Sequence, residues 1–185
     1  MAITRRSTLT AVLAAATLMG PFASTAHASA SQLVADGRRA LDKLYATEPK
    51  SRLYADNAKA VLVFPSIIKG GLVFGAQTGN GVLFVHGRPT RFYNVSAASW
   101  GLQAGGQTFS SAMFFMNGRA LAYLHRSGGF AIGSAPNVVV VDHGAAVSAS
   151  TTTLTQDVYV FTFAQKGLMA GIDIHGSKIT PIHPK

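Results

Sequence analysis

The chain has 185 residues, no cysteine and a formal net charge of +9, with 16 lysines and arginines against 7 acidic residues. Without cysteine it cannot form a disulfide or carry a lipid on a lipobox cysteine. The excess of positive charge favours an acidic partner, namely anionic lipid, nucleic acid or a polyanionic polymer of the cell envelope. A charge of this size also serves solubility alone.

The first 30 residues are predicted to be an export signal peptide that is removed. Arg5 and Arg6 precede an apolar run, 9–19, that is too short to span a bilayer comfortably. Ala28-Ser29-Ala30 matches an A-x-A cleavage site, so the mature chain is expected to start at Ser31, with an earlier cut after Ala28 as the alternative. The paired arginines leave the Sec and twin-arginine routes open. A periplasmic or secreted protein is expected, which argues against nucleic acid as a partner.

Residues 31–185 form a single predicted domain, long enough for a sizeable core, with 14 basic and 7 acidic residues. Its first element, 31–47, has apolar residues at helical spacing and is predicted to be an amphipathic helix capped by Ser31. Gly37 lowers the helix propensity by about 1 kcal/mol relative to alanine. A shorter helix is expected from Pro49 to Ala58. The apolar stripe of the first helix consists of Val34, Leu41, Leu44 and Tyr45.

The segment 60–87 is rich in glycine and β-branched residues and is predicted to fold into consecutive strands. A strand over 61–64 is expected to end at Pro65, or to lie on a sheet edge there, because proline cannot donate a backbone hydrogen bond. Residues 67–71 are expected to form an exposed turn around Lys69. A strand over 72–77 follows, then a hairpin turn at Asn80-Gly81 and a return strand over 82–86.

The rest of the chain is predicted to alternate short strands and turns. A turn over 88–91, a helix over 118–126 capped by Asn117, and a turn over 165–167 are expected between them. Residues 72–74 and 158–163 are expected to be core strands. The fold class is therefore α+β, with N-terminal helices packed on a curled, barrel-like antiparallel sheet. The further strands are expected at 92–95, 109–116, 130–132, 138–141, 145–150, 158–164 and 167–175.

No motif for catalysis, metal or cofactor binding stands out. The glycines of 75–81 are not followed by the Gly-Lys-Ser/Thr and helix of a phosphate-binding loop, and a G-x-S-x-G elbow is absent. The only tight acid–histidine pairs are Asp142-His143 and Asp173-Ile174-His175. These give weak support for a metal or acid–base site, because few groups converge. A non-enzymatic protein without a cofactor or metal is expected.

Four segments resemble one known family. They are VLVFP with the following Lys-Gly-Gly (61–71), FYNVSAASWGLQAGGQ (92–107), MNGRAL (116–121) and QKGLMAGIDIHGSKI (165–179). Together they are similar to the SYLF domain, a lipid-binding family whose eukaryotic members include actin-binding proteins. The chain departs from the family pattern before Phe92, at 140–144 and at 161–167. Phosphoinositides are ligands of eukaryotic members of the family, but neither this preference nor actin binding is carried over to this chain.

The resemblance and the basic charge together predict non-catalytic binding of anionic phospholipid at the cell envelope. In an exported protein the lipid is expected to be phosphatidylglycerol or cardiolipin. The alternative is a structural or protein-interaction module that binds an envelope protein. The first helix is expected mainly to cover the sheet, with lipid contact as its second role. For Lys69, a phosphate contact and a solvated turn lysine are both open. The candidate lipid-binding residues are Arg38, Arg39, Lys43 and Lys69.

Overall fold

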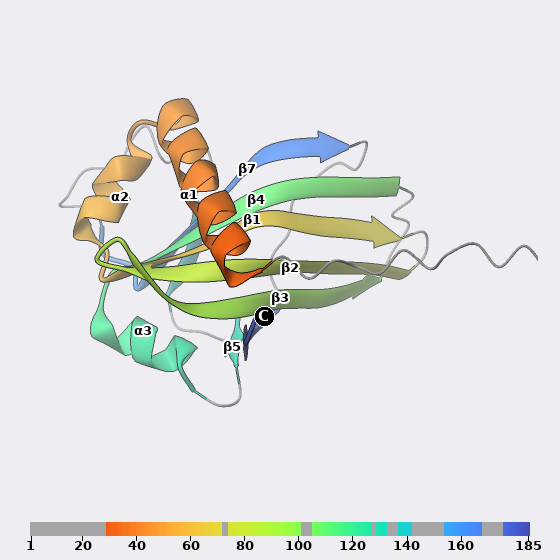
Figure 1. Ribbon diagram of the computed structural model, residues 1–185. Helices are drawn as coiled ribbons and strands as arrows, with labels where there is room; N and C mark the ends of the chain where they lie inside the picture. The colour runs from red at the N-terminus through yellow and green to blue at the C-terminus, as the bar shows by residue number, and fades with distance from the viewer. Residues whose placement is uncertain are drawn as a thin grey trace, which may run out of the picture.

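The structure is a computed structural model that describes residues 29–71, 74–100, 105–126, 129–132, 137–141, 154–167 and 176–185. These ranges contain the helices and strands drawn in Figure 1. The elements are α1 (Ala30–Thr47), α2 (Ser51–Asn57), β1 (Ala60–Gly71), β2 (Phe74–Val85), β3 (Arg88–Trp100), β4 (Gly105–Phe115), α3 (Gly118–Leu124), β5 (Phe130–Ala131), β6 (Val138–Val141), β7 (Val158–Gly167) and β8 (Lys178–Ile182).

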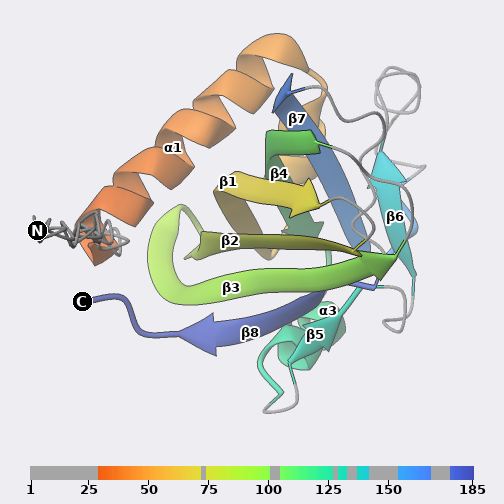
Figure 2. The same ribbon diagram turned by 90° about the vertical axis from the view of Figure 1, so that its right-hand side faces the viewer.

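The strands form one sheet in the order β5-β8-β3-β2-β1-β4-β7-β6. The sheet curls into a half-barrel, with α1 lying across its outer face (Figure 2). The pairings between the described strands are antiparallel except for β6, which runs parallel to β7. The predicted α+β class and the curled sheet are thus confirmed, and the parallel pair is an addition that the sequence did not reveal.

Each face of the sheet has its own core, because successive side chains of a strand point to opposite faces. On the outer face, α1 and α2 pack on side chains such as Val63, Phe84 and Phe161. On the inner face, α3 packs with Leu62, Phe115 and the neighbouring strands. Both α2 and α3 lie at one end of the strands, while the other end extends beyond the helices (Figure 1).

Helix α1 begins one residue earlier than predicted. The Oγ of Ser29, not Ser31, accepts a hydrogen bond from the backbone N–H of Gln32 at 3.2 Å and caps the helix. The fully buried stripe is also rotated from the predicted one, with Leu44 common to both. Val34, Leu41 and Tyr45 are half-buried at its margin. The buried stripe consists of Leu33, Gly37, Ala40 and Leu44.

Gly37 is the point of closest approach between α1 and the sheet, which explains a glycine inside a helix. A Cβ at this position would lie 2.5 Å from Cγ1 of Val82. Valine has few rotamers and cannot easily move aside. The glycine lowers the helix propensity of α1 but allows the helix to pack closely against β2.

We expect Gly37→Ala to lower the free energy of unfolding by about 1 kcal/mol, since overpacking costs about 1–3 kcal/mol against a propensity gain of up to about 1 kcal/mol. Gly118→Ala is the matched control, because a Cβ there meets nothing within 4 Å. That control should leave the stability unchanged or raise it. Urea unfolding of both variants measures the difference, and stabilisation by Gly37→Ala would contradict the close contact.

The predicted turn at 67–71 is wrong, and so is the predicted strand end at Pro65. Strand β1 continues from Ala60 to Gly71 between two partner strands. Its register shifts around Pro65 on both sides, so the residue without an N–H lies at an irregularity where the ladder is interrupted. The carbonyl of Pro65 accepts a hydrogen bond from the Ser110 hydroxyl at 2.8 Å.

The hairpin turn predicted at Asn80-Gly81 is also wrong, because both residues lie inside β2. Gly81 serves packing, since a Cβ there would lie 2.5 Å from Cδ1 of Phe64. The chain reverses at His86 and Gly87, with φ angles of 50° and 74°. Residues 88–91, predicted as a turn, belong to β3.

Several later predictions are confirmed, including β4, β6, β7 and the helix α3, whose backbone Ala120 N–H is capped by the Asn117 side chain. The turn predicted at 165–167 is wrong, because β7 continues to Gly167. Strand β8 was not predicted. Phe74 is 64% exposed, so its predicted core role is wrong. The strand predicted at 145–150, and all but Gly167 of the one at 167–175, lie outside the described residues.

Candidate functional site

The four predicted lipid-binding residues do not form one cluster. Arg39 and Lys43 line one flank of α1, while Arg38 lies on the other flank. Lys69 lies in β1 and is only 8% exposed, so its predicted place in an exposed turn is wrong. The structure therefore separates a surface site on α1 from an interior lysine.

The surface site is a groove between α1 and the outer face of the sheet, which we name the α1 groove. Its volume is about 410 Å³. Helix α1 supplies one wall, and β1, β4 and β7 supply the floor and the other wall. The lining residues used below are Asp36, Arg39, Lys43, Thr108 and Lys166.

Positive charge dominates the α1 groove, with three basic side chains against one carboxylate. Arg39 is 69% exposed and forms an ion pair with Asp36. Lys43 and Lys166 are exposed and face the groove from α1 and β7. Since exposed charges attract an anionic surface within about a Debye length, roughly 10 Å at 0.1 M salt, the groove suits an anionic surface rather than a buried ion.

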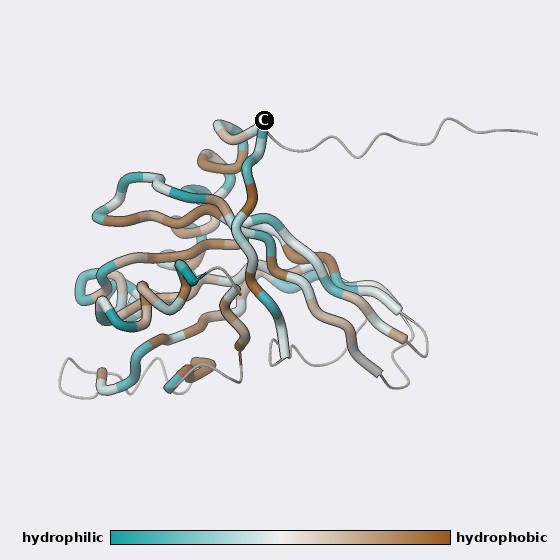
Figure 3. Tube along the Cα trace, turned by 90° about the horizontal axis from the view of Figure 1, so that it is seen from below, coloured by the Kyte–Doolittle hydropathy of each residue, from teal (hydrophilic) through white to brown (hydrophobic). Residues whose placement is uncertain are grey.

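Two large apolar side chains are exposed on the same outer face. Ile68 is 61% exposed and pairs in register with Thr108 of the groove, and Phe74 is 64% exposed at the start of β2. Ile68 lies near the end of β1 and Phe74 at the start of β2, in the part of the sheet that extends beyond α2 and α3 (Figure 1). Figure 3 shows these strands from below. Exposed apolar side chains beside basic ones are typical of surfaces that contact a membrane interface or another protein.

Arg38 is engaged in packing. Its guanidinium lies 5.4 Å from the ring centroid of Phe84, a cation–π distance, and donates a hydrogen bond to the Gly87 carbonyl at 3.4 Å. It lines a separate pocket of about 360 Å³ together with Asp42 and Lys59. Arg38 thus ties α1 to the β2–β3 turn and does not add to the charge of the α1 groove.

Strands β4 and β7, which line the α1 groove, lie in a segment that matches a known protein family. A family model named Ysc84 and described as "Las17-binding protein actin regulator" matches residues 96–183. Over these residues the chain is similar to the Ysc84, or SYLF, family. The resemblance stated from the sequence is thereby confirmed. No curated protein matches the chain.

The SYLF match covers part of the α1 groove. It includes β4 and β7, and therefore Thr108 and Lys166, whereas α1 and β1 precede it. Lys166 was missed by the sequence analysis because a turn was expected there. The available indication was the QKG of 165–167, which the sequence shares with the SYLF pattern.

Tyr93 of β3 and His125 at the end of α3 form a contact between two titratable side chains. His125 Nδ1 lies 2.8 Å from the Tyr93 hydroxyl. Burial and the nearby Arg91 lower the pKa of His125, and burial raises the pKa of Tyr93. No group of three or more His, Asp or Glu residues in the described ranges is placed to hold a metal. The two acid–histidine pairs noted in the sequence lie outside those ranges. None of the described helices is long and apolar enough to cross a membrane.

Proposed function

We propose that the α1 groove binds the surface of a membrane that contains anionic phospholipid, without catalysis and without a cofactor. The strongest support is that the α1 groove brings together three basic side chains, Arg39, Lys43 and Lys166. The exposed Ile68 lies beside them. The basic side chains would contact headgroups, and the apolar one would reach the interface. The proposal places the protein in the cell envelope after export, where phosphatidylglycerol and cardiolipin are the fitting lipids.

The expected affinity is modest. Each basic side chain near an anionic surface contributes about 1 kcal/mol, and the contribution decays within a Debye length. Three such side chains give a few kcal/mol, which supports reversible attachment in the millimolar to micromolar range together with the apolar contact. Permanent insertion is not expected.

Replacing Arg39, Lys43 and Lys166 together with glutamine should therefore abolish most co-sedimentation with phosphatidylglycerol vesicles. The matched control replaces three other exposed basic residues, Arg88, Lys178 and Lys185, with glutamine. Both variants lose the same net charge, so only the position of the charge differs. Wild type should bind phosphatidylglycerol, bind phosphatidylcholine poorly, and release at high salt.

Two results would contradict this proposal. Equal binding to neutral and anionic vesicles would exclude the electrostatic mechanism. Equal losses in the two triple variants would show that net charge, and not the α1 groove, governs attachment. Arg38→Gln should have only a small effect, because that side chain packs on Phe84.

A protein-interaction module is the second candidate, because the matched family model carries the description "Las17-binding protein actin regulator". The same exposed face, with Ile68 and Phe74, would then contact a protein. Failure of the wild-type chain to bind either kind of vesicle would make this candidate the preferred one.

A further inference from the structure

A second pocket lies on the other flank of α1 from the α1 groove, between α1, α2 and the turn that joins β2 to β3. We name it the α1–α2 pocket. Its apolar lining includes the buried Phe84 and the half-buried Leu41 and Val61. On the side of α2 and β1 the lining consists of alanines, whose short side chains leave the space open. These are Ala55, Ala58 and Ala60.

The size of the α1–α2 pocket limits what it can hold. Its volume of about 360 Å³ is near the lower end of the range for small-molecule sites, roughly 300–1,000 Å³. One ring or one branched side chain with an attached polar group fits this volume. The paired acyl chains of a phospholipid do not.

The polar lining of the α1–α2 pocket is exposed and carries more positive than negative charge. Arg38 and Lys59 bring two positive charges and His86 brings an imidazole, whereas Asp42 is the one carboxylate among the described lining residues. The two cations attract an anion, and Asp42 opposes a second negative charge on it. A monoanion with an apolar body therefore suits the pocket better than a dianion.

Arg38 is already ordered for such a ligand. Its guanidinium lies 5.4 Å from the ring centroid of Phe84 and donates to the Gly87 carbonyl at 3.4 Å. In the described part of the chain, this bond uses one of the five guanidinium N–H donors. The planar fork of an arginine matches the two oxygens of a carboxylate. Because packing holds the side chain in place, binding costs it little conformational entropy.

We propose that the α1–α2 pocket binds a small carboxylate that bears a single apolar group. The carboxylate pairs with the guanidinium of Arg38, Lys59 adds a second positive charge, and the apolar group packs on Leu41, Val61 and Phe84. A free acid and the C-terminal residue of a peptide share this chemistry. The pocket has no lining residue in common with the α1 groove, so its failure would leave the membrane proposal unaffected.

The test is an NMR titration of the ¹⁵N-labelled chain with 3-phenylpropionate, which reports both the Kd and the residues affected. The largest amide shifts should belong to residues of the pocket. Arg38→Met keeps an apolar side chain over Phe84 and removes the charge, so binding should weaken at least about tenfold, as expected for the loss of a charged hydrogen bond. Lys178→Met removes an exposed charge from β8. It is the matched control and should bind like wild type.

A second variant keeps the proposal testable if Arg38→Met does not fold. Ala55→Leu fills the pocket from α2 without changing any charge, and leucine is a good helix former. It should abolish binding of 3-phenylpropionate. Phenyl phosphate, a dianion at pH 8, should bind more weakly than 3-phenylpropionate at that pH, and Asp42→Asn should reduce the difference.

N-acetylphenylalanine and its amide complete the test. Tighter binding of N-acetylphenylalanine than of 3-phenylpropionate supports the site and assigns it to a peptide C-terminus; otherwise the binding of 3-phenylpropionate assigns it to a free acid. The uncharged amide should not bind. Equal binding of the amide and the acid, absence of binding by both carboxylates, shifts confined to residues outside the pocket, or binding that Arg38→Met and Ala55→Leu leave unchanged overturns the proposal.

Discussion

Replacing Phe161 with alanine should lower the free energy of unfolding by about 3–5 kcal/mol, the range for removing a buried aromatic ring. Phe161 is 3% exposed and lies at the centre of the outer-face core. Its ring packs edge-on against Tyr54 of α2 at 5.0 Å between centroids and against Phe114 of β4 at 5.4 Å. The substitution leaves a cavity between α2 and the sheet and removes two aromatic contacts.

Phe74→Ala is the matched control for this prediction. It removes the same group from a side chain that is 64% exposed, so the stability should change by no more than about 0.5 kcal/mol. Chemical unfolding followed by circular dichroism gives both values. A loss of stability at Phe161 no larger than that at Phe74 would show that β7 is peripheral to the core.

The sequence predicted burial correctly for Phe161 and wrongly for Phe74. The run 158–163 combines β-branched and aromatic residues without glycine, and the strand and its burial both follow from that composition. Phe74 follows an equally apolar pair, 72–73, and was predicted to be buried for the same reason. Phe74 is exposed because α1 does not cover this part of the outer face. Which part of the sheet α1 covers depends on contacts between residues far apart in the sequence.

The turns were the least predictable part of the fold. Glycine was interpreted as a sign of turns at 67–71 and at Asn80-Gly81, but Gly81 provides room for Phe64 from the neighbouring strand. Glycine satisfies turns and close packing equally well, and a local pattern does not distinguish them. Lys69 was misplaced for this reason, because its burial requires β1 to continue past Pro65.

The candidate site was predicted only in part. Arg39 and Lys43 are four residues apart on a predicted helix, so their common flank follows from helical spacing. Lys166 joins them through the pairing of β7 with β4 and of β4 with β1. Pairing between strands so far apart in the chain is not encoded in any local pattern.

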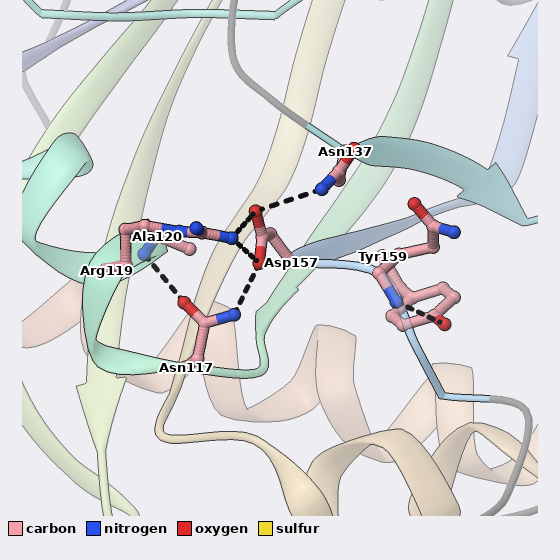
Figure 4. Close-up of polar contacts among 7 residues, drawn as sticks. Asn117, Arg119, Ala120, Asn137, Asp157 and Tyr159 are labelled. Carbon is pink, nitrogen blue, oxygen red and sulfur yellow. Dashed lines mark hydrogen bonds and ion pairs between the residues drawn. The ribbon is translucent and has the colours of Figure 1, made fainter.

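The other large effect is expected for substitution of Asp157. Its carboxylate connects α3, the start of β6 and the start of β7 (Figure 4). It accepts hydrogen bonds from Asn117, the cap of α3, at 2.5 Å and from Arg119 at 2.9 Å to both oxygens. Asn137, next to β6, donates a further bond at 3.5 Å. The Asp157 residue is 4% exposed, so these donors would be left without an acceptor in its absence.

The pKa of Asp157 is lowered, chiefly by the hydrogen bond from Asn117, and the contacts with Arg119 add to this while burial opposes it. Since the folded-state pKa lies below the unfolded value of about 3.9, the carboxylate contributes stability above that value. The contribution is lost as the pH falls through the unfolded value toward the folded one. Acid should therefore loosen the attachment of α3 and β6 to the start of β7.

Asp157→Ala should accordingly lower the free energy of unfolding by about 2–4 kcal/mol at pH 7, from lost charged hydrogen bonds and orphaned donors. The value stays below that of a fully buried ion pair because the Arg119 side chain is 73% exposed and regains water. Asp36→Ala, which removes the exposed partner of Arg39, should cost no more than about 1 kcal/mol. Urea unfolding between pH 3 and pH 7 should show a steeper loss of stability on acidification in wild type than in Asp157→Ala. Parallel pH profiles would mean that the Asp157 carboxylate does not stabilise the folded state.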